Sequence, residues 1–188
     1  MRQRVGCEVA YNADGNTTWG RSEFRIMAPA LQVLACCMHA DKRQRKRGQR
    51  PVAILERPSD GRTCVFATVV KLGPDLTDRQ FVQCLRWREK RPGLYQITNF
   101  PVEHGDRPRG EGLVRGAVRV ITEFEFVDAR ETKVTRVGYG ELGGRIPQMV
   151  VNTRAASFTC EMQQMLDGTF SVWRNAGRGR ATVGPVLG

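Results

Sequence analysis

Few residues in this chain of 188 amino acids could carry out chemistry. Its two histidines are His39, which we expect in a helix, and His104, which we expect in a loop beside Glu103. Imidazole and carboxyl groups act as general acid and base only when a partner positions them, and the sequence identifies no such partner. Nucleophile elbows, phosphate-binding loops and dinucleotide fingerprints do not occur in it. A catalytic role for Glu103 or His104 stays an open alternative, but we expect no enzymatic activity.

The six cysteines carry no metal-binding signature. No two of them are separated by two residues, and zinc sites need ligand pairs at such short spacings. Several lie within apolar runs, which favours buried, reduced thiols in an intracellular protein. We therefore predict no metal and no cofactor. The cysteines are Cys7, Cys36, Cys37, Cys64, Cys84 and Cys160.

Positive charge is concentrated in two segments. Residues 42–50 contain six basic groups and no acid, and the stretch from Gly168 onward adds three arginines. Without these nine groups the formal net charge falls from +11 to +2, which argues against a nucleic-acid-binding face in the fold. The segment 42–50 suits a solvated helix end, contact with an anionic surface or a nuclear-import signal. The residues expected to make membrane or anion contact are Lys42, Arg43, Arg45, Lys46 and Arg47.

Membrane-spanning and secretion signals are missing from the sequence. The longest charge-free apolar stretch, residues 26–40, contains Pro29 and is too short to span a bilayer. The N-terminus lacks the apolar core of a signal peptide. We therefore expect a cytoplasmic monomer that is at most peripheral at membranes.

The elements that must position these residues begin with a hairpin and a helix. Asp14-Gly15 is a strong turn signal between strands expected at 6–11 and 19–27. A helix opens at Ala28-Pro29-Ala30 and is predicted to end in the basic run 41–47. Its apolar residues at helical spacing are Leu31, Leu34, Cys37 and Met38.

From Pro51 onward the signals are those of strands separated by turn residues. Consecutive strands, with one helix after the first pair and another at the end, indicate an α+β fold. The predicted strands are 52–56, 63–71, 81–88, 94–100, 113–127 and 132–141.

The closing segment starts with a Gly143-Gly144 turn, and Pro147 stands at a natural first helical position. The helix is predicted to run to about Leu166 within a domain of residues 1–167. Residues 168–188 are expected to be a basic, disordered tail. One helix face is apolar at steps of four and three, through Val151, Ala155, Phe158, Met162, Met165 and Leu166.

Alternation within the strands indicates a sheet with one apolar face and one partly wet face. One face of strand 81–88 holds Phe81, Gln83, Leu85 and Trp87, and the other holds Val82, Cys84, Arg86 and Arg88. In strand 113–127, one face holds Val114, Gly116, Val118 and Val120, opposite Arg115 and Arg119. A long sheet of this kind, with one long helix to cover it, encloses either a packed core or a cavity.

Three ordered segments resemble motifs of the START domains, the steroidogenic-acute-regulatory-related lipid-transfer family. Residues 76–88, with Thr77-Asp78-Arg79-Gln80-Phe81-Val82 and Arg86-Trp87-Arg88, resemble its "S-x-R-D-F-V…R-x-W/R" stretch. Residues 102–116 are similar to "V-E-H-P…K-G-Y-V-R-A". Residues 132–135 with 143–152 resemble "T-K-V-T-Y…G-G-W-I-P-K-W-L-V-N". The similarity covers about Trp19 to Leu166.

The resemblance implies a helix-grip fold, in which a curved antiparallel sheet wraps around a long C-terminal helix with a lipid-holding tunnel between them. The loop with Val102, Glu103, His104 and Gly112 would be a lid at the tunnel mouth. By position, the lining residues would be Phe66, Thr68, Phe81, Leu85, Trp87, Val118, Val120, Val151, Ala155, Phe158 and Met162.

The chain departs from the family pattern at Gln80, where the family has Asp, and at Arg145, where it has an aromatic residue. The acid and base that sterol-binding members place in the tunnel fall on Phe66 and Leu85, which implies an unusually apolar tunnel. The N-terminal helix of many members is missing or lies outside this chain.

The resemblance implies a non-enzymatic lipid-binding or lipid-transfer domain that meets anionic membranes transiently and binds no nucleic acid. Two other functions stay open as alternatives. One is a helix-grip enzyme such as a cyclase or hydrolase, for which the inward polar residues would be Gln83, Thr68, Thr135 and Tyr139. The other is an interaction module whose cavity is collapsed.

Overall fold

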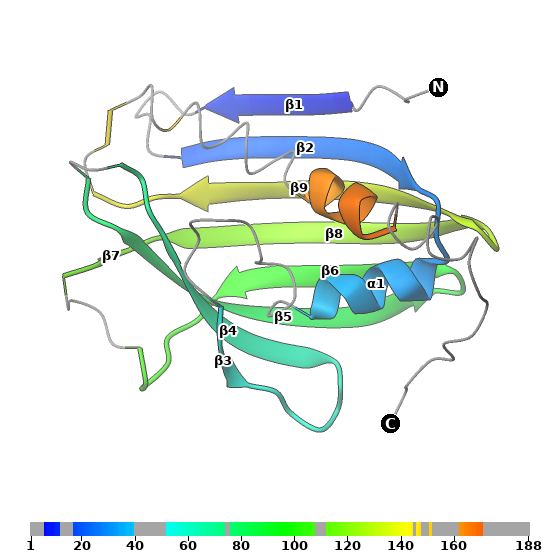
Figure 1. Cartoon of the computed structure of the whole chain (residues 1–188), viewed down its shortest axis with the longest axis horizontal. Coiled ribbons are helices and arrows are strands. Elements are labelled where there is room, and N and C mark those ends of the chain that lie inside the picture. The colour runs from blue at the N-terminus through cyan, green and yellow to red at the C-terminus, as the bar shows by residue number, and fades with distance from the viewer. Residues whose placement is uncertain are drawn as a thin grey trace.

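A computed structural model describes residues 6–11, 17–39, 52–73, 76–107, 112–144, 146–147, 151 and 162–170. Within these ranges the fold is one curved, open, largely antiparallel sheet with two helical segments on one face (Figure 1). The helices are α1 (Ala30–Met38) and residues 162–170. We call the face on which they pack the inner face and the opposite one the outer face. This arrangement confirms the predicted α+β fold of helix-grip type.

The strand order is β1-β2-β9-β8-β6-β5-β4-β3, so β1 and β3 form the two edges. Neighbours along this order pair antiparallel. The short strand β7 lies off this order and pairs in parallel with β5. The strands are β1 (Gly6–Tyr11), β2 (Thr17–Ile26), β3 (Ala53–Glu56), β4 (Thr63–Val70), β5 (Arg79–Arg91), β6 (Leu94–Pro101), β7 (Val114–Arg115), β8 (Ala117–Asp128) and β9 (Glu131–Glu141).

The strand predicted over 113–127 is in fact two strands, β7 and β8, separated by Gly116. The amide of Val114 donates to the Asp78 carbonyl at 3.1 Å, and that of Gly116 donates to the Gln80 carbonyl at 3.0 Å. These bonds pair β7 with the start of β5, whereas β8 pairs with β6 and β9. A Cβ at Gly116 would lie 2.3 Å from Cε1 of Phe81, so only glycine fits this crossing.

The first helix buries Leu34 and Cys37 and packs Met38 against the core, as predicted, and differs from its prediction at Leu31. Ala30, Val33, Leu34 and Cys37 pack inward, at the i, i+3, i+4, i+7 spacing of one helix stripe. Leu31, predicted for the apolar stripe, is instead 55% exposed, because one residue step rotates it about 100° away from that stripe. The helix ends at Met38, and the basic run that was predicted to end it lies outside the described residues.

The main core lies between the inner face and the two helices. Phe124 of β8 and Val134 of β9 are fully buried there, and Leu166 and Phe170 cover them from the C-terminal helix. The helix extends past its predicted end at Leu166, because Phe170 is buried in the core and the Thr169 hydroxyl bonds to the Met165 carbonyl. Phe170 is thus part of the described core, and residues 171–188 of the predicted tail lie outside the described residues.

The outer face is wet over β8, where Arg119 is exposed, but not over β4 and β5. There Val65, Ala67, Val82 and Cys84 form a second buried cluster. Phe100, Val102 and the β3 side chains pack against it, so this end of the sheet is apolar on both faces.

Candidate functional site

The inner face gathers most of the residues predicted to line a ligand site. Phe66, Leu85 and Met162 are buried in the main core, and Trp87 packs against them. Phe81, Val118 and Val120 form a separate inner cluster toward β7, which we call the β7-end cluster. Thr68 lies on β4 two residues beyond Phe66, and Val151 is 1% exposed. Ala155 and Phe158 lie outside the described residues.

A line of polar side chains separates these two apolar clusters. On β8, Thr122 stands between Val120 and Phe124, and on β5, Gln83 stands between Phe81 and Leu85. Ser22 of β2 and Thr122 of β8 face Arg136 of β9 from its two sides in the strand register. Asn99 of β6 continues the line to Gln83, whose amide oxygen accepts its Nδ2 hydrogen bond at 3.0 Å. We call Ser22, Arg136, Thr122, Asn99 and Gln83 the polar track.

The polar track is largely buried. Ser22 is 0%, Thr122 2% and Gln83 7% exposed. Two of its atoms, Ser22 Oγ and Asn99 Oδ1, are buried and make no hydrogen bond within the described part of the chain. Nη1 of Arg136 lies 3.8 Å from Sδ of Met162, so the guanidinium reaches from the sheet to the C-terminal helix. The described inner face therefore carries more polar side chains than Gln83 and Thr68, the two predicted inward polar residues that lie on it.

Two residues predicted as inward, Thr135 and Tyr139, are on the outer face instead. Val134 is fully buried in the inner core, so alternation turns Thr135, Val137 and Tyr139 outward. Tyr139 stacks on Trp19 with ring centroids 5.0 Å apart, and Trp19 is 46% exposed. Tyr139 is therefore not a residue of the inner site.

Arg79 connects two of the segments that carry the sequence resemblance. Its side chain is buried, and it donates from Nε to the Leu142 carbonyl and from Nη2 to the Gly143 carbonyl, both at 3.1 Å. Nη1 donates to the Thr77 carbonyl. Burial lowers the pKa of Arg79. The start of β5 is thereby fixed to the Gly143-Gly144 turn, where both glycines have positive φ.

The first half of the predicted lid loop is held at three points. The Val102 amide donates to the Val82 carbonyl at 3.1 Å, and His104 Nε2 lies 3.0 Å from Glu56 Oε1 on β3. The third point is Arg115 of β7, which donates to the Arg107 carbonyl and lies 3.9 Å from a Glu103 carboxylate oxygen. Glu103 and His104 therefore face different partners rather than forming an acid–base pair. Gly112, at the other end of the predicted lid, is exposed with φ +67°.

A pocket of about 330 Å³ opens beside this loop, where β6 separates from β8. Val82, one of its walls, belongs to the outer-face cluster, so this pocket is distinct from the inner face. Its lining is Val82, Pro101, Val102, Glu103, Arg115, Gly116, Ala117 and Glu141.

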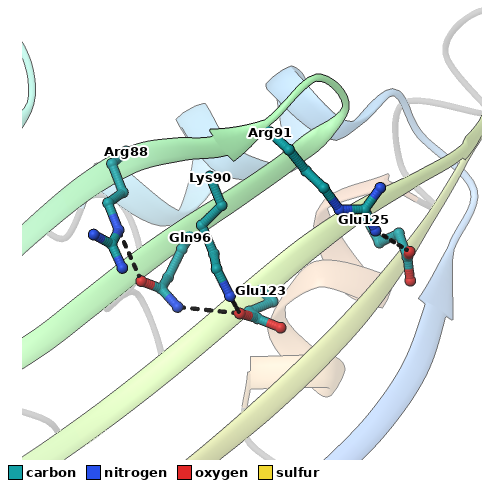
Figure 2. A network of polar contacts seen from close by, with 6 residues as sticks. All are labelled: Arg88, Lys90, Arg91, Gln96, Glu123 and Glu125. Carbon is teal, nitrogen blue, oxygen red and sulfur yellow. Dashed lines mark hydrogen bonds and ion pairs between the residues drawn. The ribbon is translucent and has the colours of Figure 1, made fainter.

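The outer face near the β5–β6 hairpin carries a polar network (Figure 2). Arg88 donates to Gln96 at 3.1 Å, and Gln96 donates to Glu123 at 3.1 Å. Lys90 also donates to Glu123, at 2.7 Å, and this bond is the main reason why the pKa of Glu123 is lowered. Arg91 pairs with Glu125 at 3.3 Å. The network connects β5, β6 and β8 on the side away from the helices.

No cluster of three or more histidine, cysteine, aspartate or glutamate side chains within the described residues could hold a metal ion. No described helix has the length and hydrophobicity needed to cross a membrane. The segment predicted to contact membranes, Lys42 to Arg47, lies outside the described residues.

Comparison with solved structures identifies the fold. No protein-family model and no curated protein sequence matches the chain. Human STARD10 superposes with a TM-score of 0.76 at 16% sequence identity, with 95% of this chain and 74% of that chain covered. The chain has the START fold. A STAR-related lipid transfer protein from Xanthomonas axonopodis gives 0.74 at 17% identity, covering 91% of this chain and 96% of that one.

Human StAR-related lipid transfer protein 5 shares the START fold with a TM-score of 0.72 at 18% identity, covering 92% of this chain and 84% of that one. The resemblance seen in the three sequence segments is thereby confirmed at the level of fold.

Sequence reasoning missed four of the five residues of the polar track, and named only Gln83. Serine, threonine and asparagine within strands carry no signal that distinguishes an inner from an outer face. Arg136 gives a misleading signal, because an arginine within a strand is ordinarily expected on the face exposed to solvent. The strand pairing of β2, β9, β8 and β6 is what brings the four together.

Proposed function

We propose that this protein is a lipid-binding or lipid-transfer domain. The proposal rests on the inner face, a curved apolar sheet surface that two helical segments cover in the START fold. Two of the superposed proteins, human StAR-related lipid transfer protein 5 and the STAR-related protein from Xanthomonas axonopodis, carry lipid transfer in their names. A lipid held between the inner face and the C-terminal helix would contact both inner clusters.

The energetics favour such a ligand. Transfer of apolar surface out of water contributes roughly 25 cal/mol per Å², or about 0.8 kcal/mol per methylene group. Leu166 and Phe170 cover Phe124 and Val134, so an acyl chain would reach these side chains only if the C-terminal helix moves outward. Its apolar area would then drive binding without a strong polar anchor. Loading requires the loop or the helix to move, and the three attachments of residues 102–107 hold that loop until they break.

The test is extraction of purified protein with organic solvent, followed by lipid mass spectrometry, and transfer of fluorescent phospholipids between vesicles. We expect a co-purifying lipid or protein-dependent transfer above the spontaneous rate. Absence of both, together with no binding of added lipids, would contradict the proposal and favour the collapsed-cavity interaction module.

An enzyme of the helix-grip class is the second reading. Among the described residues, the buried polar side chains are Ser22, Arg79, Gln83, Gln96, Thr122 and Thr132, and none of them is a carboxylate or an imidazole. Histidine, aspartate and glutamate are the usual general acids and bases, and the buried part of the inner face offers none of them among the described residues. Nothing observed favours this reading over lipid binding.

Transient membrane contact through the basic segment 42–50 is also part of the proposal, with a cytoplasmic location. Each basic residue near an anionic surface contributes about 1 kcal/mol. Vesicle sedimentation with and without phosphatidylserine would test it, comparing wild type with a variant in which Lys42, Arg43, Arg45, Lys46 and Arg47 are changed to glutamine. Equal sedimentation of both proteins would remove this part of the proposal.

A further inference from the structure

The outer face carries an exposed apolar surface on the adjacent strands β2, β9 and β8 (Figure 1). Of the seven large hydrophobic side chains exposed among the described residues, three lie here: Trp19 (46%), Ile121 (46%) and Val137 (40%). The strand register sets Val137 opposite Ile121, and Trp19 opposite Tyr139. Side chains directly opposite each other have Cβ atoms about 4.5–5.5 Å apart, so these four form one continuous surface.

Two arginines stand at opposite corners of this surface. Arg21 of β2 lies opposite Val137, and Arg119 of β8 lies opposite Tyr139. The side chain of Arg21 is 55% exposed, and Arg119 is exposed as well. We call the six residues the outer patch: Trp19, Arg21, Arg119, Ile121, Val137 and Tyr139.

The charges within the outer patch are both positive, and nearby acids are matched by basic side chains. Glu23 lies 3.1 Å from Lys133 and 3.7 Å from Arg21, and Glu123 lies 2.7 Å from Lys90. Glu8, opposite Arg21 on β1, and Glu141 on β9 limit the excess of positive charge at the border. The apolar side chains must therefore supply most of the binding energy, with the two arginines adding to it.

The outer patch continues into the pocket beside the predicted lid loop. Two residues along from the pair of Arg119 and Tyr139, the register sets Ala117 opposite Glu141. Both of these residues line that pocket, together with Val102 and Glu103 of the loop. Whatever covers the outer patch therefore lies next to a loop whose movement is one route for loading a lipid.

The residue types favour a lipid bilayer as the occupant. Tryptophan and tyrosine have amphipathic rings that suit the level of lipid headgroups, and arginine can keep its charge at the phosphates while its stem covers apolar surface. The chain's own segments 42–50 and 171–188 are basic and contain no acid, so they would add positive charge beside Arg21 and Arg119. A second copy of the chain would bury these two arginines of each partner with no acid inside the patch to pair with them.

We propose that the outer patch docks on a phospholipid bilayer, with its four apolar and aromatic side chains among the headgroups and its two arginines on lipid phosphates. This inference rests on the proposed lipid-binding function and adds the surface through which the protein meets a membrane. Arginine suits this contact, because its planar fork of donors matches the oxygens of a phosphate.

The first experiment measures affinity by sedimentation with vesicles of phosphatidylcholine, alone or mixed with phosphatidylserine. Trp19→Ser should bind the mixed vesicles about tenfold more weakly than wild type, because it loses the largest apolar side chain of the patch. Arg119→Gln should bind them about fivefold more weakly, the effect of one basic residue near an anionic surface. Leu31→Ser is the matched control, because Leu31 is 55% exposed on α1, on the opposite side of the sheet, and should stay within about twofold of wild type.

The second experiment asks whether Trp19 itself reaches the bilayer, by quenching tryptophan fluorescence with vesicles whose acyl chains carry bromine. We expect the wild type to be quenched, and Trp19→Phe to be quenched much less. Trp87→Phe is the control and should be quenched like the wild type, because Trp87 packs against the main core. Trp19→Phe keeps an aromatic ring on Tyr139, so this test does not depend on a variant that removes the ring.

The outcomes separate this inference from the proposed function. Equal vesicle affinity of wild type and Trp19→Ser, an equal loss in Leu31→Ser, or equal quenching of wild type and Trp19→Phe would overturn the inference and leave lipid binding standing. Failure of the wild type to bind either kind of vesicle would also overturn it. The proposed function falls only if, in addition, solvent extraction yields no lipid and the protein transfers none.

Discussion

At the scale of single residues, Arg79 holds the start of β5 against the Gly143-Gly144 turn. It holds three backbone carbonyls from two segments that are more than sixty positions apart in the chain. We expect such a residue to be important for stability rather than for ligand contact, because all three of its guanidinium nitrogens already donate to backbone carbonyls. This explains why an arginine in the segment 76–82 and a glycine pair at 143–144 occur together.

Arg79→Met should therefore lower the free energy of unfolding by about 2–4 kcal/mol, since it leaves buried carbonyls without donors. Urea denaturation monitored by tryptophan fluorescence would measure the loss. Arg119→Met, at an exposed position, should change the same quantity by less than about 0.5 kcal/mol. Similar losses in both variants would show that Arg79 has no special role.

Gly116 is the second residue whose identity follows from its surroundings. A methyl group there would meet the Phe81 ring and come 3.1 Å from the Glu141 carbonyl. Gly116→Ala should destabilise the protein by about 1–3 kcal/mol, the usual cost of overpacking. Gly105→Ala is the matched control, because nothing lies within 4 Å of its Cβ position. A Gly116→Ala protein as stable as the control would contradict the crossing geometry of β7 and β5.

At the scale of elements, the outer network ties the long hairpin of β5 and β6 to β8 (Figure 2). Its pH dependence follows from Glu123, whose pKa is lowered in the folded state chiefly by the Lys90 hydrogen bond. A carboxyl with a lowered folded pKa adds stability above its unfolded pKa and loses it as the pH falls through the folded pKa. The network should therefore stabilise the sheet at neutral pH and stop doing so in acid.

The variant Glu123→Gln tests whether the charge of Glu123 stabilises the sheet in this pH-dependent way. The variant should be less stable than wild type by about 0.5–1 kcal/mol at neutral pH, a small value because the pair is partly screened by solvent. The difference should shrink as the pH falls through the lowered folded pKa of Glu123 and vanish once the carboxyl is protonated. Urea denaturation over that pH range would measure it, with Glu89→Gln at an exposed position as control. A difference that persists in acid would show that lost packing, not charge, is responsible.

At the scale of the whole molecule, a ligand that binds only the folded state must raise the thermal midpoint. At a hundredfold excess over its dissociation constant the gain is about 2.7 kcal/mol, which corresponds to roughly 5–10 °C for a chain of this size. The lipid found by extraction should produce this shift in scanning calorimetry.

Substitutions at two neighbouring residues on opposite faces of β8 would show whether the ligand that causes this shift lies on the inner face. Val120 is buried on the inner face, and Ile121 is 46% exposed on the outer face. Val120→Trp should abolish the ligand-induced shift, because the larger side chain occupies the space of the lipid, whereas Ile121→Trp should retain it. A shift that survives in Val120→Trp would place the ligand away from the β7-end cluster.

The sequence by itself determined the strands, most of their ends within a few residues, and the faces of β5 and β8. Regular alternation of apolar side chains along those strands carries this information locally. In β9 alternation does not define the buried face, because Val134 and Val137 stand three residues apart, and Thr135 and Tyr139 lie on the outer face instead of the predicted inner one. It also failed at Leu31, because the helix is apolar around most of its circumference.

Only the tertiary structure decided what the inner face contains. Ser22 and Arg136 are more than a hundred positions apart, and the pairing of β2 with β9 places them opposite each other. Alternation tells which side of its own strand a residue occupies, but not which strands are neighbours, since that depends on how the whole sheet is ordered. Alternation along β5 and β8 could thus be read from the sequence, and the polar side chains that the strand order gathers on the inner face could not.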